Sequence, residues 1–315
     1  MFAAAFAFCA LAACSLPTET SGVSSDSKKK TDDGTGGGSI IGTDDGVAPG
    51  PAATKASDCT EAATFPYVVS EENGLYRFDP SKLTFTNIGQ LSCPAAPGAR
   101  PFGMSVDRTA TAWINYTDGS LFRVSTADAS CQKSAFVPPA DFKTFGLGFT
   151  TNQGDPTKES LYVVGCDTQT GGSAGLGRID MTTFALTKIG PFGAAAQNRC
   201  GDLTGTGDGR LFGLFDGTPA VFANVAPATS LTSAEQMLSA LDTSHAAYAF
   251  SFWGGDFWFY TANDGSGSTP ATRSKVTHYK AATDGSTSVV LEDTGFTISG
   301  AGVSTCAPTK PPVVN

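Results

Sequence analysis

Charge, histidine and long apolar runs are all scarce in this sequence. Only 16% of the 315 residues are charged, and 29 acidic residues outnumber 20 basic ones, so the net charge at pH 7 is −9. Binding to nucleic-acid phosphates needs clustered lysine and arginine, so this balance argues against a nucleic-acid partner. With two histidines and no CxxC pair, the sequence also lacks the usual ligand set of a zinc site.

Glycine and phenylalanine are abundant instead. The chain contains 37 Gly and 22 Phe, while the residues that build long amphipathic helices are few. This composition is typical of many short strands joined by tight turns. We therefore expect an all-β fold, and the length suffices for one large domain.

The first 13 residues, MFAAAFAFCALAA, are uncharged and apolar. That length suits a signal peptide and is too short for a membrane-spanning helix, which needs roughly 20 residues. The run ends in Leu11-Ala12-Ala13-Cys14, which resembles the bacterial lipobox, and this resemblance implies that Cys14 becomes the lipidated first residue. No basic residue precedes the run, so an upstream start codon and an ordinary cleaved signal with a chance cysteine are alternatives.

Residues 14–57 follow as a low-complexity tether rich in Ser, Thr, Gly, Asp and Pro. A segment of this kind cannot bury enough apolar surface to fold, and a coil of this length spans roughly 35 Å. Ser15, directly after the lipidated cysteine, suggests the outer membrane, on its periplasmic face or at the cell surface. We expect the acyl anchor to bind the lipid membrane, with a folded domain over residues 58–308 and a disordered tail over residues 309–315.

Internal repeats indicate the architecture of this domain. Residues 75–89 (LYRFDPSKLTFTNIG) align without gaps with residues 176–190 (LGRIDMTTFALTKIG), and a weaker copy begins at Leu121 (LFRVS). Degenerate copies begin near Val221 and Lys275, so the copies start roughly every 45–55 residues, the spacing of four-stranded propeller blades. The sequence therefore predicts a β-propeller, with a β-sandwich as the alternative.

The two ends of the domain are predicted to form one blade together. The first repeat lacks the glycine-rich inner strand that precedes the other copies, and residues 298–304 form such a strand with no blade after it. Assigning this C-terminal strand to the first blade closes a ring of five blades and leaves no open inner edge. A sixth blade would have to lie within residues 230–241, but SAEQMLSAL predicts a short helix capped by Ser233.

Six cysteines remain after Cys9 and Cys14, an even number that indicates disulfides in an exported chain. Cys59 and Cys306 lie near the proposed closing strand, so a bond between them would link the two ends of the domain where the ring closes. The pairs Cys93–Cys131 and Cys166–Cys200 are suggested as links between neighbouring blades. Fifteen connectivities are possible in principle.

Signatures of catalysis are few. The G-x-S-x-G elbow is absent, and His245 and His278 have no catalytic context. The segment from Asp202 to Gly209 can offer oxygen ligands to Ca²⁺ through Asp202 and Asp208, but it lacks the EF-hand spacing and its closing Glu, and a turn between two strands is the favoured interpretation. The adjacent acids Glu71 and Glu72 would point to opposite sides of a strand, which argues against a paired catalytic site.

The anchor motif, the tether, the PYVVSEENGLYRFDPSKLTFTNIG and GTGDGRLFGLF blocks and the Gly-Val-Ser-Thr-Cys306-Ala-Pro ending together resemble secreted lipoproteins of myxobacteria. This resemblance covers nearly the whole chain and implies localisation and repeat architecture, but it assigns no catalytic residue. The sequence thus favours a non-enzymatic binding or scaffolding module at the cell envelope, with a protein or a glycan as ligand and no cofactor. The alternative is a propeller glycosidase or lactonase with carboxylates such as Glu71 or Asp202, or a metal, in the central channel.

Overall fold

The computed structural model describes residues 59–311, apart from 168–169, 171, 242, 244–246, 264 and 266–270. The predicted signal peptide, the predicted lipidation site Cys14, the predicted tether and His245 therefore lie outside the described residues. Within the described residues, no helix is long and apolar enough to cross a membrane.

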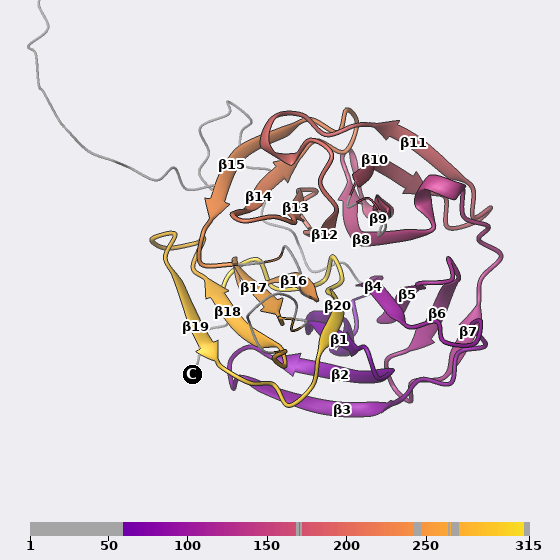
Figure 1. Cartoon of the computed structure of the whole chain (residues 1–315), viewed down its shortest axis with the longest axis horizontal. Coiled ribbons are helices and arrows are strands. Elements are labelled where there is room, and N and C mark those ends of the chain that lie inside the picture. The colour runs from indigo at the N-terminus through magenta and orange to yellow at the C-terminus, as the bar shows by residue number, and fades with distance from the viewer. Residues whose placement is uncertain are drawn as a thin grey trace, which may run out of the picture. The chain divides into compact units, whose positions relative to one another are not determined.

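Five four-stranded antiparallel sheets are arranged as the blades of a propeller (Figure 1). Blade 1 contains β20 (Ile298–Gly302), β1 (Tyr67–Ser70), β2 (Gly74–Asp79) and β3 (Thr84–Gln90). Blade 2 contains β4 (Pro101–Val106), β5 (Thr111–Tyr116), β6 (Leu121–Ser125) and β7 (Cys131–Lys133). Blade 3 contains β8 (Thr144–Asn152), β9 (Asp155–Asp167), β10 (Gly172–Ile179) and β11 (Leu186–Gly190).

Blade 4 contains β12 (Gly201–Gly205), β13 (Leu211–Phe215), β14 (Ala220–Val225) and β15 (Thr232–Leu238). Blade 5 contains β16 (Tyr248–Trp253), β17 (Asp256–Thr261), β18 (Lys275–Tyr279) and β19 (Thr287–Leu291). Three short 3-10 helices accompany them: η1 (Ala62–Thr64), η2 (Ala140–Phe142) and η3 (Ala194–Ala196). The predicted five-bladed all-β propeller is confirmed.

The C-terminal strand closes the ring as expected. β20 pairs antiparallel with β1, with Tyr67 opposite Gly302 and Val69 opposite Gly300. Blade 1 is thereby built from both ends of the domain, and the inner strand that the first repeat lacks is supplied by the last segment of the fold.

Glycines allow the inner strands to approach one another closely around the axis. A Cβ atom added to Gly146 of β8 would lie 2.2 Å from the carbonyl oxygen of Gly201 in β12, and one added to Gly302 of β20 would lie 2.5 Å from the Cα of Ser105 in β4. Side chains at these positions would push neighbouring blades apart. The glycine content of the predicted inner strands therefore reflects backbone packing at the axis.

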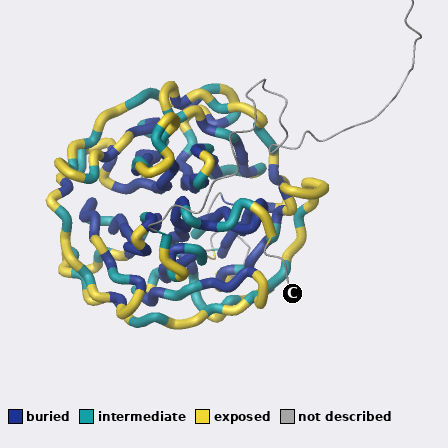
Figure 2. Tube along the Cα trace, turned by 180° about the vertical axis from the view of Figure 1, so that it is seen from behind, coloured by how far each residue is buried: buried dark blue, intermediate teal, exposed yellow. Residues whose placement is uncertain are grey.

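The core lies in the seams between the blades. Alternate residues of each strand face opposite neighbours, so large side chains such as Phe78, Phe145, Phe222 and Phe257 are fully buried between sheets. In blade 5 the run from Phe250 to Tyr260 forms two buried strands joined at Gly254 and Gly255. Buried residues concentrate towards the centre of the domain and exposed ones along its rim (Figure 2).

The predicted helix beginning at Ser233 is wrong. Residues 232–238 form β15, the outer strand of blade 4, which pairs with β14 through Val221 opposite Met237 and Phe222 opposite Gln236. The segment contains good helix formers, but the open edge of β14 offers a row of backbone hydrogen bonds that a helix would leave unpaired. Tertiary pairing thus overrides local propensity here.

Two of the predicted disulfides are present. Cys59 is joined to Cys306, and Cys93 to Cys131. Cys166 and Cys200 are both buried and are near neighbours, because the sulfur of Cys200 lies 3.5 Å from the carbonyl oxygen of Gly172, next to the cross-strand partner of Cys166. A bond between these two cysteines stays a prediction.

The Cys59–Cys306 bond should stabilise the domain more than the Cys93–Cys131 bond. The two bonds close segments of 247 and 38 residues, and loop entropy makes the longer closure worth about 1.7 kcal/mol more. We expect the double variant Cys59→Ser/Cys306→Ser to lose about 2–5 kcal/mol in the free energy of unfolding, measured in urea. An equal or smaller loss than in Cys93→Ser/Cys131→Ser would contradict this assignment.

Candidate functional site

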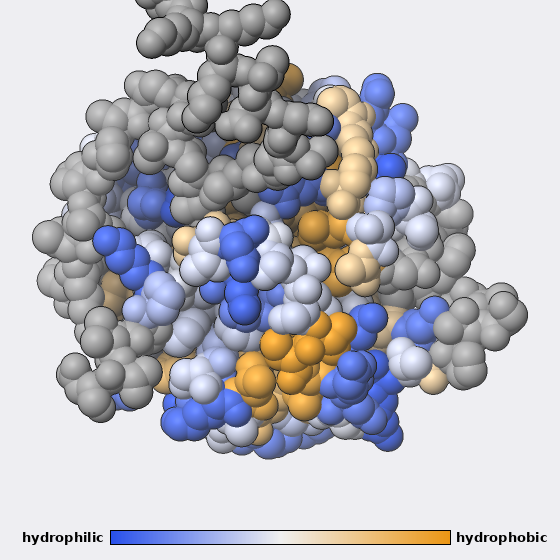
Figure 3. Space-filling model, turned by 90° about the vertical axis from the view of Figure 1, so that its left-hand side faces the viewer, coloured by the Kyte–Doolittle hydropathy of each residue, from blue (hydrophilic) through white to orange (hydrophobic). Residues whose placement is uncertain are grey.

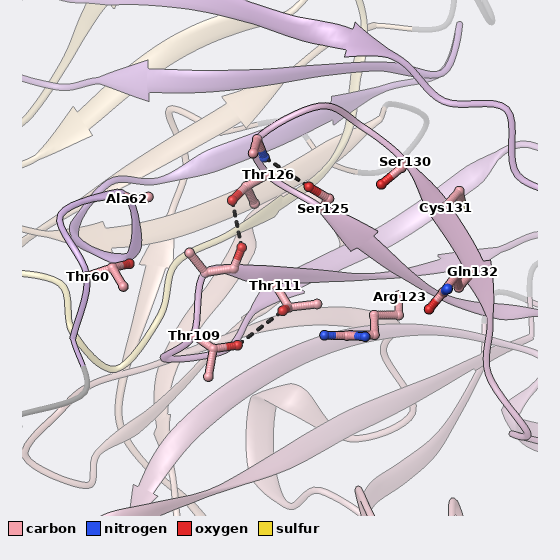
Figure 4. Close-up of a pocket in the computed structure, with 12 residues that line it drawn as sticks. Thr60, Ala62, Thr109, Thr111, Arg123, Ser125, Thr126, Ser130, Cys131 and Gln132 are labelled. Carbon is pink, nitrogen blue, oxygen red and sulfur yellow. Dashed lines mark hydrogen bonds between the residues drawn. The ribbon is translucent and has the colours of Figure 1, made fainter.

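A depression of about 690 Å³ lies at the edge of blade 2 (Figure 4). Eight of its twelve lining residues carry hydroxyl, amide or guanidinium groups, and the other four are three alanines and the disulfide-bonded Cys131. The eight polar residues are Thr60, Thr109, Thr111, Arg123, Ser125, Thr126, Ser130 and Gln132. We call this feature the blade 2 depression.

Paired strands position one wall of the blade 2 depression. Thr111 of β5 lies opposite Ser125 of β6, and Arg123 of β6 lies opposite Gln132 of β7. Residues that face each other in an antiparallel sheet project to the same side, so Arg123 and Gln132 are neighbours. Thr60, just after the disulfide-bonded Cys59, forms the opposite side of the depression in Figure 4.

Internal hydrogen bonds fix several hydroxyls of the depression and leave other groups for a ligand. Thr126 Oγ1 donates to the carbonyl oxygen of Ala110 at 2.6 Å, and the hydroxyls of Thr109 and Thr111 are 3.1 Å apart. The side chains of Arg123 and Gln132 are exposed and make no hydrogen bond or ion pair to any described residue. The wall therefore combines ordered hydroxyls with one cation and one amide that face solvent.

Asp202 lies at the axis of the propeller and is almost fully buried. The backbone N–H groups of Leu147 in blade 3 and Phe250 in blade 5 donate to its two carboxylate oxygens, at 3.2 and 3.4 Å. Inner strands have no further strand to pair with on the axial side, so their amides need other acceptors. Asp202 is such an acceptor for the two blades on either side of its own.

A second carboxyl lies near this axial position. Burial raises the pKa of Asp216 to about 6, although the guanidinium of Arg199 opposes the shift. Tyr248, the first residue of β16, has its phenol pKa raised by burial and further by the negative charges of Asp216 and Asp202. A carboxyl that changes protonation near neutral pH is a group that could act as a general acid.

The carboxylate oxygens of the two residues suggested as calcium ligands accept hydrogen bonds from other groups of the protein. Asp202 accepts the backbone amides described above, while both carboxylate oxygens of Asp208 accept hydrogen bonds from the guanidinium of Arg210, at 2.7 and 3.1 Å. Among the described residues, no three His, Cys, Asp or Glu side chains gather into a possible metal site. Calcium binding by this segment stays a prediction without support from these contacts.

Glu71 and His278 also have identifiable partners. Glu71 lies in the turn after β1 and forms an exposed ion pair with Arg100, at 3.6 Å. His278 Nε2 lies 2.9 Å from a carboxylate oxygen of Asp256, and the ring stacks on Trp258 at a centroid distance of 4.0 Å. His278 is therefore held within blade 5 by its neighbours.

Sequence reasoning did not identify the blade 2 depression as a site. Its residues come from three separate stretches, around residues 60–62, 109–111 and 123–132, each with the composition of an ordinary turn or strand. One signal was present, because the repeat alignment places Arg77, Arg123 and Arg178 at the same position of three blades. An arginine in the third strand of each of these blades has no role in forming the strand itself.

An apolar patch is visible on the side of the domain where β19 lies (Figure 3). On this strand Val289 is exposed, and Val290 and Leu291 are half-buried. Phe85 and Phe296, whose ring centroids are 5.4 Å apart, are also only partly buried. Such a surface is compatible with a protein contact.

No family model and no curated protein matches this chain. Among solved structures, the chain is similar to one described as the Dos1 propeller, with a TM-score of 0.40 and 10% identity, over 74% of this chain and 57% of that one. It is also similar to a protein of unknown function from Bacteroides caccae, with a TM-score of 0.37 and 10% identity, over 72% and 71% of the two chains. This chain thus spans little more than half the length of the first of these proteins.

Replacing Asp202 should cost more stability than replacing Asp208. In Asp202→Asn one carboxylate oxygen becomes an amide group that cannot accept a backbone N–H, so a buried donor loses its partner at a cost of about 1–3 kcal/mol. Asp208→Asn breaks a partly exposed ion pair, which is worth less than about 1 kcal/mol. Urea unfolding of both variants checks this order, and equal losses would show that Asp202 has no special axial role.

Asp216 should make the domain less stable as the pH rises. Its pKa in the folded state, about 6, exceeds the usual value of 3.8, so the folded state binds the proton more tightly and this stabilisation is lost between about pH 4 and pH 6. We expect the melting temperature of Asp216→Asn, relative to the unmodified protein, to be higher by a few degrees at pH 7 than at pH 4.

Asp180→Asn provides a control of opposite sign. Backbone hydrogen bonds from Thr183 and Thr182 lower the pKa of this exposed carboxyl, so its contribution to stability is present near neutral pH and is lost in acid. The relative melting temperature of this variant should therefore fall from pH 4 to pH 7. The same direction in both variants would contradict the assignment of Asp216.

Proposed function

We propose that this protein is an envelope-anchored recognition module that binds a glycan in the blade 2 depression. The observation that carries the proposal is the concentration of hydroxyl, amide and guanidinium groups in one depression of about 690 Å³. Hydroxyl groups donate and accept hydrogen bonds at once, which matches the hydroxyls of a sugar. The volume also lies within the range that is usual for ligand sites.

The scaffold around the depression supports binding with little reorganisation. Its walls are paired strands of blade 2, and its opposite side follows Cys59, which is bonded to Cys306. Tyr67 adds a further link, because its phenol donates to the carbonyl oxygen of Ala62 at 3.0 Å. A site on rigid elements loses less conformational freedom when a ligand binds.

Anchoring at the cell envelope is the second part of the proposal. It rests on the apolar run of residues 1–13, on Cys14 after Leu11-Ala12-Ala13, and on the tether that follows. The disulfides Cys59–Cys306 and Cys93–Cys131 support export, because such bonds persist in oxidising compartments. A tethered domain with a side-facing site could reach glycans of the envelope or of its surroundings.

A propeller hydrolase is the second candidate, favoured by one observation. The charges of Asp216 and Asp202 both act on Tyr248, and a carboxyl with a pKa of about 6, as in Asp216, is suited to proton transfer. Against it, the oxygens of Asp202 are engaged by backbone amides of two neighbouring blades. The polar groups left for a ligand are therefore better represented in the blade 2 depression.

The anchor is tested by replacing the lipidation candidate. We expect Cys14→Ala to move the protein from the membrane fraction to the soluble fraction when cells are separated by centrifugation, because the acyl chains supply the attachment. Ser15→Ala is a matched control that keeps the cysteine. If Cys14→Ala remains in the membrane fraction, the lipoprotein assignment is wrong.

The glycan site is tested with two exposed residues of its wall. We expect Ser130→Ala/Gln132→Ala to weaken binding about tenfold, as the loss of one or two hydrogen bonds of roughly 0.5–1.5 kcal/mol each implies. A glycan array with the full chain identifies the oligosaccharide, and calorimetric titration measures its affinity. Thr187→Ala, on the outer strand of blade 3, serves as control, and equal affinities of both variants would place the site elsewhere.

A further inference from the structure

Acidic side chains are absent from the blade 2 depression, although acids outnumber bases in this chain by 29 to 20. None of the twelve lining residues is Asp or Glu, and one is Arg. Glu61 stands between Thr60 and Ala62 in sequence but does not line the depression, and the two other acids nearest in sequence have donors of their own. Asp107 accepts hydrogen bonds from Thr109, Thr111 and the indole of Trp113, and Asp128 accepts one from the amide of Ser130.

Arg123 projects from this acid-free wall as an exposed cation. Its cross-strand neighbours are Trp113, which is almost fully buried, and Gln132, which carries no charge. Within the described part of the chain no carboxylate pairs with Arg123. An arginine in this setting keeps all its donors for an anion, which it can hold through two parallel hydrogen bonds.

A second arginine without an anion lies behind the depression. Arg77, at the equivalent repeat position of blade 1, is half-buried, and its Nε atom is buried with no hydrogen-bond partner. Its guanidinium stacks over the ring of Phe65 at 4.8 Å. No described acid pairs with it, so a buried donor and a positive charge are left without a counterpart.

Tyr67 connects Arg77 to the depression. It lies opposite Arg77 in the sheet, and its phenol is bonded to Ala62, which lines the depression. Thr126, another lining residue, also interacts with this phenol, and the charge of Arg77 acts on it. The positive field of Arg77 therefore reaches the same depression that Arg123 faces from blade 2.

We infer that the ligand of the blade 2 depression is an anionic glycan, one that carries carboxylate or sulfate groups among its hydroxyls. The inference rests on the proposed function and specifies its ligand class. Arg123 binds the anionic group directly, the hydroxyls and Gln132 bind the neighbouring sugar hydroxyls, and Arg77 adds favourable potential from behind. A depression formed only of hydroxyls and amides would not distinguish anionic from neutral sugars, whereas these two arginines would.

The test compares an oligouronide with the same oligosaccharide after its carboxyl groups have been reduced to alcohols. A sulfated oligosaccharide forms a third arm, which distinguishes the two sources of negative charge. Using the full chain, we expect the oligouronide or the sulfated sugar to bind at least tenfold more tightly than the reduced form. We also expect that preference to shrink as salt is raised.

Arginine variants assign the effect to the depression. Arg123→Gln should weaken binding of the anionic sugar at least tenfold and weaken binding of the reduced sugar much less. Arg178→Gln is the matched control, because Arg178 is exposed at the same repeat position of blade 3, away from the depression. Arg77→Gln should weaken binding less than Arg123→Gln, and Arg77→Lys should restore it, which separates the charge from a folding defect.

The outcomes separate the two levels of the proposal. Equal binding of the anionic and reduced sugars, or equal effects of Arg123→Gln and Arg178→Gln, overturns the anionic ligand but leaves a glycan site in place. If neither an anionic nor a neutral glycan binds, the proposed function itself fails, and the inference fails with it.

Discussion

The pairing of β20 with β1 is the contact on which the rest of this domain depends. It places the last strand of the fold against the first, so that blade 1 obtains its inner strand and the ring has no open edge. The Cys59–Cys306 bond joins the chain on either side of this pairing. Without it, the seams on both sides of blade 1 would lose one wall of their apolar core.

Other contacts gather at the same closing segment. Thr305 donates to a carboxylate oxygen of Glu159 at 2.8 Å, and the guanidinium of Arg108 donates to Thr305 at 3.1 Å, so blades 2 and 3 are both tied to the C-terminal end. Burial raises the pKa of Glu159, while hydrogen bonds and Arg108 oppose the shift. These contacts give Arg108, Glu159 and Asp202 structural partners. The groups proposed to bind a ligand lie elsewhere, at the blade 2 depression.

Much of this architecture follows from the sequence. The repeats predict five blades because each third strand recurs with the same pattern, and the orphan strand at residues 298–304 predicts the closure. The pairs Cys59–Cys306 and Cys93–Cys131 follow from their positions beside the closure and in neighbouring blades. The predicted helix at Ser233 is wrong, because residues 232–238 pair with the edge of β14 as a strand. Local composition does not show that this edge is available for pairing.

The functional residues are less predictable for a physical reason. Asp202 stands in a sequence of Asp, Thr and Gly that suits a calcium loop or a turn, and only the packing of three blades shows that it holds backbone amides. The depression is assembled from three stretches that are separate in sequence: two of them pair within blade 2, and the third, residues 60–62, precedes blade 1. Arg77 and Arg123 are visible as a repeated arginine, but their lack of counter-ions is a property of the folded neighbourhood.

Hydrogen exchange of the full chain, measured by mass spectrometry with and without a binding oligosaccharide, tests the central claim most directly. Recognition on the side of a closed ring predicts slower exchange in residues 109–111 and 123–132, with no change around Cys200, Asp216 and Tyr248. Protection that appears instead around those axial residues would contradict the account and favour chemistry in the central channel.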